Sequence, residues 1–176
     1  MTFKNTYQKI CDKLGTELVI VEEQPFINNI VDDVSRYEFN LEVDNHKCRF
    51  IIINNIKTLI IIENLPIEKF SFFAIQASLL GPIFNPSAHL KIGRSTFKIG
   101  SSSKYFLNRL ATKEVLSGFL TMTKNLNILT SNSKSSDETL EVINPKLQIT
   151  LFSVPKNVTQ VKNVLTSVSK LLDKIH

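Results

Sequence analysis

The strongest constraint on the fold is the run from Arg49 to Glu63, RFIIINNIKTLIIIE. Two isoleucine-rich stretches flank Asn54 and Asn55, and β-branched residues on both sides of an asparagine pair predict a β-hairpin. Asparagine tolerates positive φ better than other non-glycine residues, so the pair can form the turn. Apolar residues occupy both faces of these strands, which is typical of central strands covered on both sides. The run therefore predicts the middle of a sheet, and it carries no catalytic signature.

Length and composition predict an ordinary globular protein. The chain has 176 residues, 43% hydrophobic and 21% charged, and a chain of this length buries roughly 70% of its unfolded surface. No apolar run reaches the roughly 18 residues that a membrane span needs, so we expect no transmembrane segment. The N-terminus has no signal-peptide pattern, and Cys11 and Cys48 lack metal-type spacing. We therefore expect reduced thiols and a cytoplasmic location. An abundance of Lys, Ile and Asn suggests an AT-rich bacterial genome.

The first half of the chain predicts a helix, a group of strands and a second helix. Apolar spacing indicates an amphipathic helix over residues 3–14, and strands are expected at 17–22, 37–43, 47–53 and 56–63. Residues 26–36 are ambiguous between a loop and a short helical turn. Residues 67–80 are apolar on most sides, so we expect a largely buried helix that Gly81 and Pro82 end.

The second half repeats this order. We expect a hairpin of 90–92 with 97–99, a helix that starts after Ser101–Ser103 and continues through Leu120, and a strand at 127–130. Residues 131–137 (SNSKSSD) form the most polar link and predict an exposed loop. A hairpin of 138–143 with 147–152 is expected across Asn144 and Pro145, followed by an amphipathic helix over 158–175.

Strands in twos and threes, each group closed by a helix, predict an α+β fold. We expect an antiparallel sheet of meanders and hairpins, packed by about four helices. The composition does not shift along the chain, so a single domain over residues 1–176 is favoured. Two similar lobes, 1–84 and 85–176, that share a sheet are the alternative.

Signals for catalysis or metal binding are close to absent. His46, His89 and His176 have no neighbouring ligand at metal-type spacing, and no glycine-rich nucleotide motif or nucleophile elbow occurs. Arg49 could lower the pKa of the Cys48 thiol, but a structural thiol is the favoured interpretation. We predict no catalytic residue, no metal and no cofactor, and we lean against an enzyme.

Charge is spread unevenly, and this gives the candidate site. Residues 1–66 hold 7 Lys and Arg against 10 Asp and Glu, whereas residues 67–176 hold 14 against 6. Small polar residues at a helix start can offer N–H groups and hydroxyls to an anion. The predicted anion-binding residues are Lys91, Arg94, Lys98, Ser101, Ser102, Ser103 and Lys104. A solvated cationic face is the favoured alternative.

This surface limits the classes of partner. An acidic protein or an anionic surface would suit it. Sequence-specific nucleic-acid binding is not expected, because Arg is scarce, Trp is absent and no nucleic-acid motif occurs.

Two stretches resemble known families. Residues 97–120, FKIGSSSKYFLNRLATKEVLSGFL, with LQITLF at 147–152 and the amphipathic helix after it, resemble bacterial domains of unknown function. There, a strand ending in small polar residues precedes a helix and a turn into a second helix. Here Leu110–Lys113 occupy that turn without its proline. The order of elements in the first half is similar to that of type III secretion chaperones, which are usually acidic. Neither resemblance implies a functional residue.

Three hypotheses for the function follow. The first is a non-enzymatic binding or scaffold protein, because the core is well patterned and catalytic motifs are missing. The second is a carrier of an apolar or lipid-like small molecule, held in a cavity between the sheet and a helix. The third is an enzyme of unrecognised type, with a site assembled from distant residues.

Overall fold

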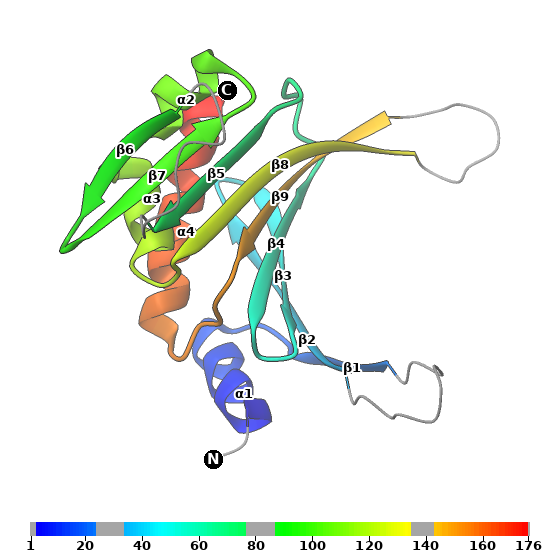
Figure 1. Cartoon of the computed structure of the whole chain (residues 1–176). Helices are drawn as coiled ribbons and strands as arrows, with labels where there is room; N and C mark the ends of the chain where they lie inside the picture. The colour runs from blue at the N-terminus through cyan, green and yellow to red at the C-terminus, as the bar shows by residue number, and fades with distance from the viewer. Residues whose placement is uncertain (1–2, 24–33, 77–86, 135–142, 176) are drawn as a thin grey trace, which may run out of the picture.

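The computed structural model describes residues 3–23, 34–76, 87–134 and 143–175. Within them lie four helices and nine strands (Figure 1). The helices are α1 (Phe3–Leu14), α2 (Lys104–Leu110), α3 (Lys113–Leu120) and α4 (Val158–Ile175). The strands are β1 (Val19–Glu23), β2 (Val34–Val43), β3 (His46–Ile53), β4 (Lys57–Glu63), β5 (Ser71–Gln76), β6 (Ser87–Ile92), β7 (Ser95–Ser101), β8 (Asn125–Lys134) and β9 (Ile143–Leu151). The α+β class is confirmed.

All nine strands form one antiparallel sheet in the order β1-β2-β3-β4-β9-β8-β5-β7-β6. The first four strands form a meander, of which the sequence predicts the last three, β2 to β4. Strand β9 comes from the end of the chain and inserts between β4 and β8. The two halves of the chain therefore share a single sheet.

Helices α2, α3 and α4 lie on one face of this sheet, behind β5, β6 and β7 in Figure 1, and α1 contacts α4 at its lower end. Helix α4 contacts β2 as well as α2 and α3, and those two short helices pack on β7, β6 and β8. The sheet thus curves around α4. Alternate positions of the strands point into this layer and are completely buried, among them Phe39, Phe50, Ile60 and Ile149. Burial of these side chains supplies most of the driving force for folding.

The predicted turn at Asn54 and Asn55 is confirmed, and a second turn with positive φ precedes β3. Asn54 and Asn55 have φ values of 51° and 54°, and the Ile56 N–H donates to the Ile53 carbonyl over 3.0 Å. Asp44 and Asn45 have φ values of 50° and 64° and connect β2 to β3. Asparagine and aspartate enter this left-handed region at lower cost than other residues with a side chain.

The predicted helix over residues 67–80 is wrong, because residues 71–76 form strand β5. Phe72 and Ala74 are buried on the helix side, while Phe73 and Ile75 lie on the other side of the sheet. A strand that is apolar on both faces has no clear period of two, and it is easily mistaken for a buried helix. The proposed stop at residues 81–82 lies outside the described residues, as does most of the ambiguous stretch 26–36.

The prediction for residues 131–152 is also wrong in part. Strand β8 continues to Lys134, where a loop was expected, and β9 runs without a turn through Asn144 and Pro145. Pairing of β9 with β4 begins only at Lys146. Pro145 therefore pairs with β8 alone and has no neighbour on the β4 side. Proline lacks a backbone N–H, and at such a position no hydrogen bond between strands is lost.

Helices α3 and α4 approach closely at Gly118. Its N–H donates to the Ser167 hydroxyl over 2.9 Å, and a Cβ at this position would overlap the carbonyl oxygen of Asn163. Only glycine allows this separation of the two helix backbones. None of the described helices is long and apolar enough to cross a membrane.

Candidate functional site

The second face of the sheet is covered by none of the described helices. Its side chains come from the alternate strand positions that point away from α4. In one cross-strand row Ile51 lies beside Leu59, and Leu59 lies beside Thr150. The row continues through Asn127 to Phe73. The row is therefore apolar on β3, β4 and β5, with a threonine on β9 and an asparagine on β8 between them.

A neighbouring row adds Ile61 and Leu129, one on each side of Gln148. We call the apolar members of both rows, together with Ile75, the apolar strip: Ile51, Leu59, Ile61, Phe73, Ile75 and Leu129. The side chains at its β5–β8 end are well exposed, Ile75 by 46% and Leu129 by 43%, whereas Ile51 is only 3% exposed. Its members come from β3, β4, β8 and β5, and β9 lies between β4 and β8 with polar residues in both rows. Strands are spaced about 4.8 Å apart, so the strip extends over roughly 19 Å.

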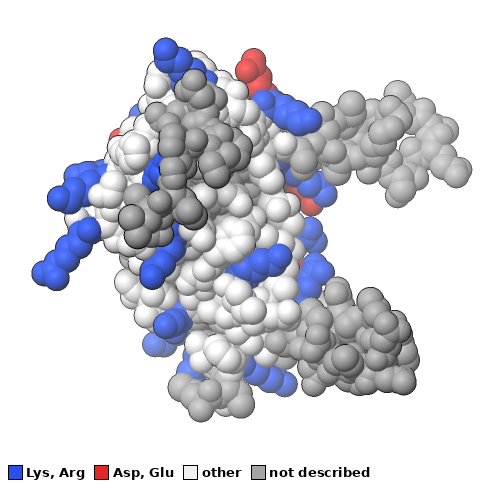
Figure 2. All heavy atoms as spheres, in the orientation of Figure 1, with Lys and Arg blue, Asp and Glu red and all other residues white. Residues whose placement is uncertain are grey.

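The position of Phe73 in the strip depends on a glycine. A Cβ at Gly100, its cross-strand neighbour on β7, would overlap the end of the Phe73 ring. The ring therefore lies over the β7 backbone. Figure 2 shows this side of the molecule: Lys and Arg outnumber Asp and Glu, and uncharged residues fill most of its centre.

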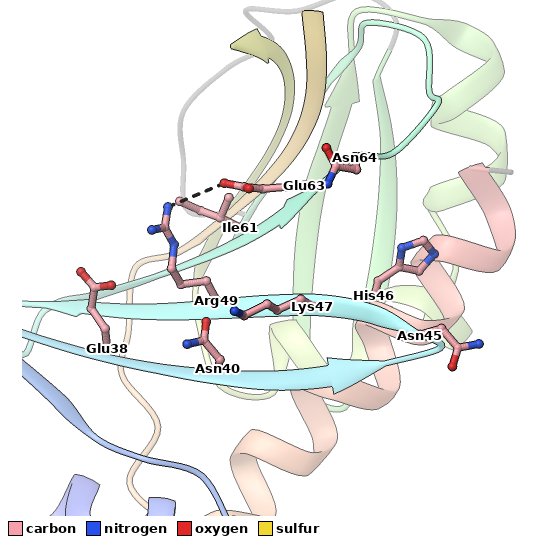
Figure 3. Close-up of a pocket in the computed structure, with 9 residues that line it drawn as sticks. All are labelled: Glu38, Asn40, Asn45, His46, Lys47, Arg49, Ile61, Glu63 and Asn64. Atoms are coloured by element: carbon pink, nitrogen blue, oxygen red, sulfur yellow. Dashed lines mark ion pairs between the residues drawn. The ribbon is translucent and has the colours of Figure 1, made fainter. Parts of the chain in front are cut away.

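A polar groove of about 530 Å³ adjoins the strip on strands β2 to β4. Its lining residues are Glu38, Asn40, Asn45, His46, Lys47, Arg49, Ile61, Glu63 and Asn64 (Figure 3). Asn45 and Asn64 follow β2 and β4 with φ values of 64° and 61°, a conformation that asparagine tolerates. Ile61 belongs to the groove and to the strip, so the two are continuous.

Ion pairs hold the charged groups of the groove in place. The Glu63 carboxylate lies 3.9 Å from Arg49 and 3.3 Å from Lys146, and Glu38 lies 2.5 Å from Arg36. In the Glu63–Arg49 pair and in the Glu38–Arg36 pair, both side chains are partly exposed to solvent. Each pair therefore contributes little to the stability of the fold. Their effect is on position: they orient the carboxylates along the groove.

The groove was not predicted from the sequence. A signal for it does exist: positions 38 and 40, 47 and 49, and 61 and 63 are alternate residues of three strands whose hairpins the sequence predicts. If the pairing registers of the β2–β3 and β3–β4 hairpins are applied together, these six residues lie on one face of the sheet.

The structure distributes the predicted anion-binding residues over two ends of β7. Lys91 and Lys98 lie on the uncovered face, as the alternation of the hairpin predicts, and Arg94 lies in the turn between β6 and β7. Lys104 begins α2, beyond the far end of β7. A seven-residue strand spans roughly 23 Å, so Arg94 and Lys104 cannot contact one small anion.

The hydroxyls of Ser101 and Ser102 are already hydrogen-bonded within the protein, whereas the Ser103 hydroxyl makes no cap bond to α2. The Ser101 hydroxyl donates to the Ser71 carbonyl over 2.8 Å, and the Ser102 hydroxyl accepts from the Ser71 N–H over 2.9 Å. The N–H groups of Ser102 and Ser103 donate to Ser71 and Ser101. These serines join β7 to β5. Anion binding at this position stays a prediction.

The thiols are buried on the helix side of the sheet. Burial raises the pKa of Cys48 to about 12 and that of Cys11 to about 11, with nearby Asp44 and Asp12 contributing less. Arg49 points to the opposite face from Cys48 and does not activate it. Among the described residues, no group of three His, Cys, Asp or Glu side chains could hold a metal ion.

Comparisons with known proteins find similarity in fold. No family model matches the chain, and no curated protein matches it in sequence. The crystal structure of the mycobacterial trehalose monomycolate transport factor A, TtfA, is similar, with a TM-score of 0.57 and 10% sequence identity. The match covers 98% of this chain and 93% of that one. At this identity the likeness shows a shared fold.

Proposed function

We propose that this chain is a non-enzymatic binding protein and that the uncovered face of its sheet is the binding surface. The observation that carries this is the apolar strip. It lies on a face that no described helix covers, while the interior on the other face is filled by fully buried Phe, Ile and Leu side chains. Apolar residues gathered on a face that no described helix covers favour a binding surface.

The ligand class that suits this surface is an amphipathic, lipid-like molecule. An apolar chain can lie along the strip and remove it from water, at about 25 cal/mol per Å² of apolar area. The groove beside Ile61 can take the polar end of the same molecule. The fold likeness to a protein named as a trehalose monomycolate transport factor supports a carrier of this kind. The site lies on the open face rather than in a cavity between sheet and helix.

Catalysis is the weaker alternative. A nucleophilic thiol needs a lowered pKa, and burial raises the pKa of both cysteines. The polar and charged residues of the groove can orient a bound ligand, and a binding protein needs this as much as an enzyme does.

Paired variants test the binding surface. Leu59→Asn with Leu129→Asn places two polar side chains in the strip, and Ile56→Asn is the control, because Ile56 is 67% exposed in the β3–β4 turn. Octyl amphiphiles below their micelle concentration should bind the wild type and the control, and calorimetry should show at least tenfold weaker binding to the strip variant. Native mass spectrometry gives a second readout of retained ligand. If the wild type binds none of the amphiphiles, the proposal of a lipid-like ligand is contradicted. If all three proteins bind them equally, the apolar strip is excluded as the binding surface.

A further inference from the structure

Both carboxylates of the polar groove are already paired with cations. Its lining holds two cations, Lys47 and Arg49, against two carboxylates, Glu38 and Glu63. Lys146 contacts Glu63 from outside the lining, and Arg36 contacts Glu38 in the same way. A cationic group placed here would find no unpaired carboxylate and would meet the cations. The charges of the groove therefore do not favour a cationic ligand end.

The same lining mixes hydrogen-bond donors and acceptors closely. The amides of Asn40, Asn45 and Asn64 each donate and accept, the carboxylates accept, and the lysine and arginine donate. A hydroxyl group also donates and accepts, so a ligand with several hydroxyls can pair with all these groups at once. A ligand with only acceptors or only donors would leave some of the groove's polar groups without a hydrogen-bond partner. Each such group would weaken the binding free energy.

We propose that the groove binds an uncharged, polyhydroxylated headgroup, such as a sugar, of the amphipathic ligand whose chain occupies the apolar strip. This inference rests on the proposed function. Its volume of about 530 Å³ is within the range of small-molecule sites. Ile61 joins the two parts: it lines the groove, and Leu59 lies two positions before it on the same face of β4. The headgroup and the chain of one molecule can therefore be bound together.

Three amphiphiles with the same octyl chain separate the headgroup from the chain. One carries a glucoside headgroup, one a phosphocholine and one a carboxylate. Calorimetry below the micelle concentration, with amide NMR shifts to locate the contact, should show the glucoside binding about tenfold more tightly than the carboxylate, the gain that one or two added hydrogen bonds give.

A matched pair of variants then tests the groove itself. Asn40→Ala with Lys47→Met removes one amide and one ammonium from the groove, and methionine keeps the length of the lysine chain. Asn163→Ala with Lys170→Met removes the same groups from the pocket of about 250 Å³ between α3 and α4. The groove variant should bind all three amphiphiles alike, whereas the control should keep the preference for the glucoside.

The outcomes distinguish this inference from the proposed function. Binding of all three amphiphiles to the wild type with equal affinity, or a preference for phosphocholine or carboxylate, would overturn the headgroup assignment and leave the strip intact. A glucoside preference that survives in the groove variant would overturn it as well. Failure of every amphiphile to bind would overturn both.

Discussion

The two faces of the sheet are built from the same strands and have opposite chemistry. On β4 the buried residues Thr58, Ile60 and Ile62 point toward the helices, and the partly exposed Leu59 and Ile61 point away from them. On the helix side of β4 every position is apolar or hydrogen-bonded, as Thr58 is by its hydrogen bond of 2.8 Å to the Ser153 carbonyl. On the uncovered side apolar residues alternate with charged and amide groups. One face is built for packing against helices, and the other is covered by none of the described helices.

Adjacent isoleucines on β4 give the sharpest test of this difference. Ile60→Ala removes a fully buried side chain and leaves a cavity, so the free energy of unfolding should fall by about 4 kcal/mol. Ile61→Ala removes a partly exposed side chain, and the loss should be about 1 kcal/mol. Urea unfolding of both variants measures the two values. Equal losses would mean that the second face is buried as deeply as the first.

Sequence reasoning found the hairpins of β2 to β4 and of β6 with β7, and it missed this asymmetry. Asn54 and Asn55 marked their turn because the required positive φ selects few residue types. The period of the final helix was clear for a similar reason, since only one of its faces is apolar. Because isoleucines lie on both sides of β3 and β4, the sequence predicts that both faces of these strands are covered. The structure shows that the described helices cover only one of the two faces.

The groove and β5 show a second limit of the sequence. The groove gathers residues from three strands and two turns, so its membership depends on the register of two hairpins at once. Strand β5 is apolar on both sides, which erased the alternation that identifies a strand. Pairing with β7 and β8 decides its conformation, and those partners are distant in the chain.

Two glycines extend the comparison to backbone packing. In Gly118→Ala the new methyl group overlaps the backbone of α4, so α3 and α4 must move apart, and the free energy of unfolding should fall by about 3 kcal/mol. In Gly100→Ala the methyl group meets only the Phe73 ring, which can rotate, and the loss should be about 1 kcal/mol. Thermal unfolding compares the two. A larger loss for Gly100→Ala would show that the uncovered face is rigidly packed.

Because the Cys48 thiol is buried on the helix side of the sheet, we expect the free energy of unfolding to depend on pH. Folding raises the pKa of Cys48 from 9.0 to about 12, because burial disfavours the thiolate. The folded state therefore holds the proton more tightly. Its contribution to stability is complete below pH 9 and is lost as the pH rises toward 12, by at most about 1.4 kcal/mol per pH unit.

Cys48→Ala should flatten the alkaline loss of stability in urea unfolding curves. The thiol should also react with iodoacetamide only after unfolding. Rapid alkylation of the folded wild type at neutral pH would contradict the burial that raises this pKa.

The smallest effect concerns the cations at the β6–β7 end of the uncovered face. Residues 69–113 contain seven Lys and Arg and no Asp or Glu, and Lys91 and Lys98 point to the same side as the apolar strip. Lys91→Glu with Lys98→Glu should change the free energy of unfolding by under about 0.5 kcal/mol. Binding to anionic liposomes should nevertheless weaken, because the reversed charges then repel the surface.

Lys162→Glu with Lys170→Glu makes the same change in net charge on α4, the opposite side of the molecule, and should leave liposome binding nearly unchanged. Binding by the wild type should also fall with salt, since charges are screened beyond roughly 8 Å at physiological ionic strength. Co-sedimentation at two salt concentrations measures both effects. If the two double variants lose binding equally, net charge alone attracts the protein to the membrane, and the uncovered face has no preferred orientation toward it. If only the β6–β7 variant loses binding, the face that carries the apolar strip is also the face that meets the lipid surface, as a carrier that loads its ligand from a membrane requires.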